Sequence, residues 1–283
     1  MRKKTSILVT VLSIFILAGF TVVQDPPTAR ITNGILTANL YLPDAENGYY
    51  RGMRFDWSGV VNSLDYKGHH YFGVWNPHYS PTLHDAITGP VEVFEPLGYD
   101  TAKPGESFVK IGVGLLQKQS DSAYVFSRNY KILSHGNWKV KRKKDHVQFL
   151  HTLKDETGYG YTYAKTVRLT KGKPEMVLAH QLTNTGTKTI ETTVYNHNFF
   201  VIDQEPTNEN IVTSFPFKVK AEGKGFGTLI LAEDNSLRFT RALRKGENVY
   251  TPAIGGYGTS ENDYKIEISN LKSGASVNIT SAD

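Results

Sequence analysis

The stretch DHVQFLHTLKDETGYGYTYAKTVRL, residues 145–169, shows the alternation of two neighbouring β-strands. Apolar side chains and one histidine occupy every second position of its first half, at Val147, Phe149, His151 and Leu153. The polar segment 155–158 has turn chemistry, and Tyr159, Tyr161 and Tyr163 then share one face of the next strand. Successive side chains of a strand point to opposite faces, so this stretch predicts an antiparallel hairpin with one buried face.

Similar patterns lie on both sides of this hairpin. In residues 176–182 the alternate positions are Met176, Leu178, His180 and Leu182, and residues 187–200 are rich in Thr, Val and Ile. Residues 29–42 and 59–72 read as earlier strands or hairpins, whereas the Pro- and Gly-rich segment 76–105 reads as a long loop. Helical periodicity is hard to find. The chain is therefore predicted to be all-β, a large antiparallel β-sandwich, with residues 25–283 forming one domain.

The first 24 residues have the pattern of a targeting segment. Arg2, Lys3 and Lys4 precede an uncharged, mostly apolar run from Ser6 to Val23. A signal peptide needs this order, although an uncleaved signal anchor would have it too. We therefore expect an exported protein, periplasmic or extracellular, that contacts a membrane only through residues 1–24 if they are retained. The chain has no cysteine, which excludes disulfides and thiol nucleophiles.

The charge balance gives no case for a nucleic-acid partner. The formal net charge is +5, from 32 Lys+Arg against 27 Asp+Glu. Residues 1–24 contain three of the basic groups and no acid, so the remainder carries 29 − 27 = +2. The basic run KVKRKK at 139–144 is interpreted as a strand end and turn with solvated side chains.

Few segments have the pattern of a known catalytic motif. The sequence contains no phosphate-binding loop, nucleophile elbow or His-Glu-x-x-His helix, and no metal or organic cofactor is implied. His69 and His70 are adjacent, so in a strand their rings point apart, and His151 and His180 read as hydrogen-bonded sheet histidines. The segment VYNHNFFVID, residues 194–203, differs because it presents Asn, His and Asp from a strand end. It suits the positioning of a ligand, although an Asn/His pair could instead close the strand end through backbone hydrogen bonds.

The segment NHNFF, residues 196–200, resembles the Asn-His-x-x-Phe segment of the aldose 1-epimerase, or galactose mutarotase-like, group. Weaker similarities to that group lie in LAHQLTNTG at 178–186, RGMRF at 51–55, GVVNSLDYKG at 59–68 and TGPVEVF at 88–94. The resemblance implies a mutarotase-like isomerase in which His197 protonates the ring oxygen of an aldose. It also implies that hydroxyl groups of the sugar are contacted by further side chains, here expected to be Arg54, Asn196 and Lys110, with His84 or Glu92 lining the loop side.

Three departures from the family pattern stand beside these similarities. The segment ESFVK, residues 106–110, has Glu and Lys where relatives carry His and Arg. The family's general base is a Glu on a strand near the end of the fold, whereas residues 264–270 and 275–280 resemble the two strands before that one. We therefore expect a C-terminally incomplete domain without the base, for which Glu267 is a poor substitute. Classical mutarotases are, in addition, often cytoplasmic.

Two other interpretations remain open from the sequence. One is a non-catalytic or accessory carbohydrate-binding sandwich of the cell envelope, favoured by the missing base and by Trp57, Trp75 and Trp138, since aromatic rings stack on sugar faces. The other is a structural or envelope-assembly sandwich, which has no positive sequence feature but which the fold alone does not exclude. For both the mutarotase-like enzyme and the carbohydrate-binding sandwich, the expected partner is a monosaccharide or oligosaccharide.

Overall fold

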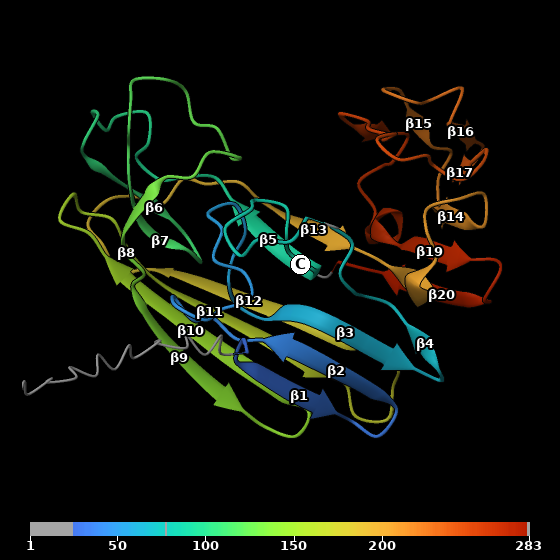
Figure 1. Ribbon diagram of the computed structural model, residues 1–283, viewed down its shortest axis with the longest axis horizontal. Coiled ribbons are helices and arrows are strands. Elements are labelled where there is room, and N and C mark those ends of the chain that lie inside the picture. Colours follow the sequence, from blue (N-terminus) through green and yellow to red (C-terminus); the bar gives the residue numbers. More distant parts are fainter. Residues whose placement is uncertain (1–24, 77, 282–283) are drawn as a thin grey trace, which may run out of the picture.

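A computed structural model describes residues 25–76 and 78–281, and this part of the chain is built from antiparallel β-sheets (Figure 1). Its only helical elements are two 3₁₀ turns, η1 (Ile202–Gln204) and η2 (Glu261–Tyr264). No helix in the described ranges is long and apolar enough to cross a membrane. The predicted all-β, sandwich-like fold class is confirmed, while the predicted targeting segment 1–24 lies outside the described residues.

Two four-stranded sheets form the base of the sandwich. The first has the order β1-β2-β3-β4, with bounds Thr28–Thr32, Leu36–Tyr41, Val60–Tyr66 and His69–His70. The second has the order β12-β11-β10-β9, with bounds Met176–Asn184, Gly160–Leu169, His146–Lys154 and Asn137–Arg142. Both sheets contribute to one hydrophobic core, which contains Leu40 and Val61 from the first and Val147, Phe149 and Val167 from the second.

The hairpin of β10 and β11 forms as its alternation predicts. Val147, Phe149, His151 and Leu153 are all buried, and His151 pairs with Tyr163 in the antiparallel register. His151 is a hydrogen-bonded sheet histidine, as predicted, since its ring nitrogens contact the His135 carbonyl oxygen at 2.8 Å and the Tyr161 hydroxyl at 3.0 Å. The hairpin predicted within residues 59–72 also forms, because β3 pairs with β4 around a turn at residues 67–68.

A second layer lies over the sheet of β9 to β12. It contains the pair β5 (Gly89–Phe94) and β13 (Val194–Phe199), and a three-stranded sheet of β6 (Ser107–Lys110), β7 (Gly114–Gln117) and β8 (Lys131–Ser134). Phe94 of β5 packs in one cluster with Leu153, Tyr161 and Tyr163, which fixes β5 against β10 and β11. Figure 1 shows β5 and β13 crossing above that sheet.

Two sequence predictions in this layer are wrong. The segment 76–105 is not one long loop, because β5 runs through its middle and every residue of that strand is buried. The predicted strand 187–200 is shorter, because only Val194–Phe199 is in strand conformation. Both errors concern the layer that carries the predicted site, so they change which residues that site can contain.

The C-terminal third has a small core of its own. Its main sheet has the order β16-β17-β14-β19-β20, with bounds Ile230–Glu233, Ser236–Phe239, Ile211–Ser214, Ile266–Asn270 and Ala275–Ile279. A two-stranded sheet pairs β15 (Lys220–Ala221) with β18 (Ile254–Gly255). Phe215, Ile230 and Leu237 form a cluster separate from the sandwich core, whereas Ile268 and Val277 pack against the sandwich core itself.

Candidate functional site

The antiparallel pair of β5 and β13 divides the predicted site residues between two faces. In its register Asn196 lies opposite Glu92, and His197 lies opposite Val91. Directly opposed residues project to the same side of a sheet, and neighbours along a strand project to opposite sides. His197 therefore shares a face with Tyr195 and Phe199, whereas Asn196 and Glu92 project from the other face.

His197 lies among aromatic rings. Its imidazole stacks on Phe199, with ring centroids 3.9 Å apart, and meets the ring of Phe55 edge-on at 5.8 Å. Phe199 stacks in turn on Trp75, whose indole N–H donates to the Ile87 carbonyl oxygen at 2.8 Å. Trp75 nevertheless keeps 41% of its surface exposed, so the aromatic wall beside His197 is open to solvent.

Arg54 is held beside this wall by several contacts. Its Nη1 forms an ion pair with the carboxylate of Asp85, and its Nη2 donates to the hydroxyl of Tyr195 at 3.2 Å. The guanidinium carbon lies 4.3 Å from the ring centroid of Phe126 and 4.7 Å from that of Phe55, within the range of cation–π interactions. The Arg54 Nε atom is buried and has no hydrogen-bond partner among the described residues.

Asp85 links the arginine to the predicted His84. The second carboxylate oxygen of Asp85 lies 3.2 Å from His84 Nε2, and the His84 ring meets Phe126 edge-on at 5.7 Å. Burial lowers the pKa of His197, the positive charge of Arg54 lowers it further, and the negative charge of Asp85 partly opposes both. His197 is therefore mainly neutral at pH 7. We call these four polar residues and their aromatic neighbours the His197 surface. It consists of His197, Arg54, His84, Asp85, Phe55, Trp75, Phe126, Tyr195 and Phe199.

Three of the predicted residues do not join the His197 surface. Lys110 is buried, its Nζ donates to the carbonyl oxygen of Phe94, and burial lowers its pKa to about 8. Glu92 does not lie in a loop as predicted but in β5, with 2% of its surface exposed. Asn196 is exposed, but on the face of β13 that Glu92 shares. The structure thus brings His197, Arg54 and His84 together and separates them from Glu92, Lys110 and Asn196.

The sequence interpretation missed several members of the His197 surface. Tyr195 and Phe199 lie two positions before and after His197, so period-two alternation along the strand could have placed them on its face. Asp85 follows His84 directly, and a carboxylate next to a candidate histidine was a further signal. Phe126 offered no sequence signal, because it reaches Arg54 from a loop far along the chain.

The other face of β5 covers a buried polar network that the sequence did not reveal as a unit. Lys165 of β11 forms an ion pair with Glu92, lies 3.7 Å from an Asp56 carboxylate oxygen and donates to the Ser58 carbonyl oxygen at 2.9 Å. The hydroxyl of Tyr163 contacts Asp56 Oδ2 at 3.2 Å and His180 Nδ1 at 3.0 Å. A buried charge is expensive unless paired, so the contacts with Lys165 are what allow both carboxylates to lie here.

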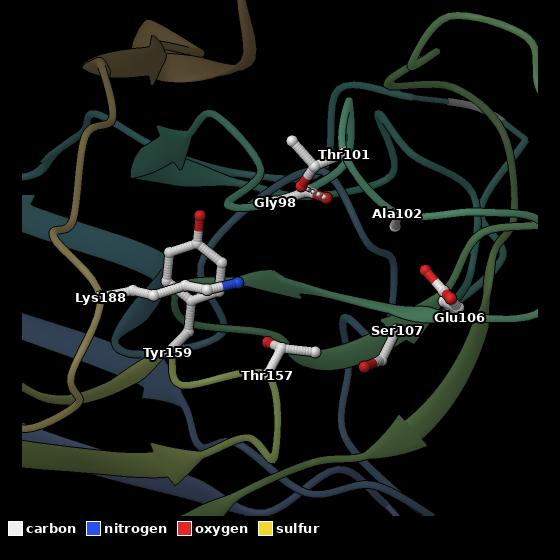
Figure 2. A pocket seen from close by; sticks show the side chains of 8 residues that line it. All are labelled: Gly98, Thr101, Ala102, Glu106, Ser107, Thr157, Tyr159 and Lys188. Atoms are coloured by element: carbon white, nitrogen blue, oxygen red, sulfur yellow. Dashed lines mark hydrogen bonds between the residues drawn. The ribbon is translucent and has the colours of Figure 1, made fainter.

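A small cavity lies away from both faces (Figure 2). Figure 2 shows Lys188 lying across the ring of Tyr159, and its Nζ is 4.9 Å from the ring centroid. The cavity contains none of the predicted site residues; its lining is Gly98, Thr101, Ala102, Glu106, Ser107, Thr157, Tyr159 and Lys188. Within residues 25–76 and 78–281, no three His, Asp or Glu side chains gather in a way that could hold a metal ion.

Comparisons of the chain with protein-family models, with curated proteins and with solved structures found no match.

Proposed function

We propose that the chain binds a carbohydrate on the His197 surface and interconverts the anomers of an aldose there. One observation carries the proposal: His197 projects from a β-strand between aromatic rings, and one of these rings, Phe55, also contacts Arg54 of the Arg54–Asp85–His84 group. Aromatic rings accept the C–H face of a sugar, and charged or polar groups next to them accept or donate hydrogen bonds to its hydroxyls. The resemblance of residues 196–200 to the mutarotase-like segment supports the same assignment.

The chemistry needs an acid and a base. In its protonated form His197 donates to the ring oxygen while the ring C–O bond breaks, and a carboxylate takes the proton of the anomeric hydroxyl. Asp85 is the carboxylate of the His197 surface and the base in this proposal, with Arg54 and His84 orienting it. Each proton transfer contributes about 10²–10⁴-fold to the rate.

The direct test follows anomer exchange of aldoses by polarimetry or by NMR exchange spectroscopy. A His197→Gln variant should lose the acceleration, and His146→Gln serves as the matched control, because His146 lies in β10, outside the His197 surface, and its ring hydrogen-bonds to its neighbour Asp145. Wild-type protein that does not accelerate exchange for any aldose, or a His197→Gln variant as fast as wild type, would refute the enzyme proposal.

The pH dependence distinguishes the role of His197. The pKa of His197 is lowered from its ordinary value, so the protonated acid is populated only on the acidic side of neutrality. As a general acid in the free enzyme, His197 should make kcat/KM fall as pH rises through that lowered pKa. A rate that rises over the same range would assign His197 as the base instead.

A second candidate function is non-catalytic carbohydrate binding on the same surface. Both carboxylate oxygens of Asp85 already have cationic or histidine partners, and Phe126 and Tyr195 are 47% and 45% exposed beside them. A stacking surface without a free base can bind a sugar but does not catalyse the exchange of its anomers. Thermal stabilisation by sugars that disappears in Trp75→Ala, without anomer exchange, would establish this function.

A further inference from the structure

The buried network behind β5 contains one acceptor that lacks a donor. Glu92 Oε2 contacts Lys165, but Glu92 Oε1 is buried and has no hydrogen-bond partner in the described part of the chain. It lies 3.4 Å from Nε2 of His180. An unpaired buried carboxylate oxygen costs free energy, which a donor placed against it would recover.

His180 is where this network reaches solvent. It projects from β12, an edge strand of its sheet, and keeps 30% of its side chain exposed although Glu92 and Lys165 behind it are buried. Asn196 lies directly opposite Glu92 on β13 and is exposed. Leu182 follows His180 on the same face of β12, so a carboxylate, an imidazole, an amide and an apolar side chain lie close together there.

The proton positions along the network depend on where the Tyr163 hydroxyl proton lies. With that proton assigned to Asp56 Oδ2, at 3.2 Å, the Tyr163 oxygen accepts the Nδ1 proton of His180 across 3.0 Å. A neutral imidazole carries one proton, which leaves His180 Nε2 as an acceptor. It then faces Glu92 Oε1, a second acceptor, across 3.4 Å. Two acceptors facing each other need a donor from outside the network, and a hydroxyl group is a neutral donor.

We propose that His180, Glu92 and Asn196 form a second ligand site, on the opposite face of β5 and β13 from His197, and that it binds a hydroxyl group of a neutral polyol such as a sugar. The ligand hydroxyl donates to Glu92 Oε1 or His180 Nε2, and the Asn196 amide donates to a neighbouring ligand oxygen. The site does not depend on the function proposed for the His197 surface.

The titration behaviour of His180 agrees with a neutral imidazole. Burial lowers the pKa of His180 to about 4, the charge of Lys165 lowers it further, and Asp56 opposes both, so the imidazole stays neutral.

Imidazole ¹⁵N NMR of the full chain tests the proton assignment without any substitution. In wild-type protein near pH 7, His180 should be the neutral tautomer protonated at Nδ1. A His180 ring protonated at Nε2, or at both nitrogens, would overturn the site, because the Nε2 proton would itself be the donor that Glu92 Oε1 lacks. In Tyr163→Phe the Nδ1 proton loses its acceptor, so the tautomer should change to Nε2–H, which can donate to Glu92.

Titration with D-glucose and D-galactose tests the ligand site. Either hexose should shift the His180 ring signals in wild type and in His197→Gln, and the matching shift should be lost in Glu92→Gln. Because Glu92→Gln changes a buried pair, Asn196→Ala provides a second variant at an exposed position, with an expected several-fold loss of affinity. His180 signals that neither hexose shifts, or shifts that vanish in His197→Gln, would overturn the site.

Discussion

Replacing Asp56 by Asn should remove a pH dependence from the stability of the fold. Asp56 is 1% exposed, and burial is the main cause that raises the pKa of its carboxyl group from 3.8 to about 6, with Glu92 adding to the shift and Lys165 opposing it. A raised carboxyl pKa means that the folded protein binds this proton more tightly than the unfolded chain does. The free energy of unfolding that Asp56 contributes should therefore fall as pH rises from about 4 to about 6 and then stay constant.

The size of the effect follows from the shift. Roughly two pKa units at about 1.4 kcal/mol each give about 3 kcal/mol across this range. Asn cannot titrate. As pH is lowered from about 6 to about 4, wild type should therefore gain up to about 3 kcal/mol of stability relative to Asp56→Asn. Any loss of hydrogen bonds with Ser58 or Tyr163 adds a constant that does not depend on pH.

Urea unfolding at a series of pH values between about 4 and 7, followed by circular dichroism, measures both stabilities. Asp121→Asn is the matched control, because Asp121 is exposed. The free energy of unfolding of this variant, plotted against pH, should run parallel to that of wild type. Parallel curves for Asp56→Asn and wild type would contradict the prediction, since they would mean that Asp56 has the same proton affinity in the folded and unfolded states.

Three further outcomes can be measured by unfolding or by binding. Lys165→Met should lower the free energy of unfolding in urea by about 3–5 kcal/mol, because it leaves two buried carboxylates without their cation. Gly59→Ala should cost about 1–3 kcal/mol in the same assay, because Gly59 has a φ of +64° and a Cβ there would lie 2.8 Å from a methyl group of Val167. Trp75→Ala should weaken sugar binding several-fold in calorimetry, because it removes the exposed ring stacked on Phe199, while the melting temperature changes little.

The fold class could be predicted because alternation is a local property. Val147 to Leu153 bury one face of β10, and the pattern is visible within nine residues. The strand β5 was missed for a different reason: it is buried on both faces, its alternation is limited to Val91-Glu92-Val93, and the Gly and Pro at its start resemble loop chemistry. A strand of this kind is recognised only when its partner, here β13, is known.

The candidate site could be predicted only in part. His197, Arg54 and His84 were named from a resemblance, and the structure brings them together. The buried network could not be predicted, because Asp56, Glu92, Lys165 and His180 are each a single polar residue in a separate segment. Only the packing of β5 on β11 and β12 shows that these four polar side chains form one network.

The separate hydrophobic cluster of the C-terminal third has a consequence for motion. Phe215, Ile230 and Leu237 form a core that shares no buried residue with the sandwich, and β19 joins the two, because Ile266 packs against this small core and Ile268 packs against the sandwich core. Regions with their own small core open locally at lower free energy than the whole molecule. Amide protons of β14 to β18 should therefore exchange with deuterium earlier than those of β10 and β11. The slowest exchange should be found in β10 and in β11, the strand that carries Lys165.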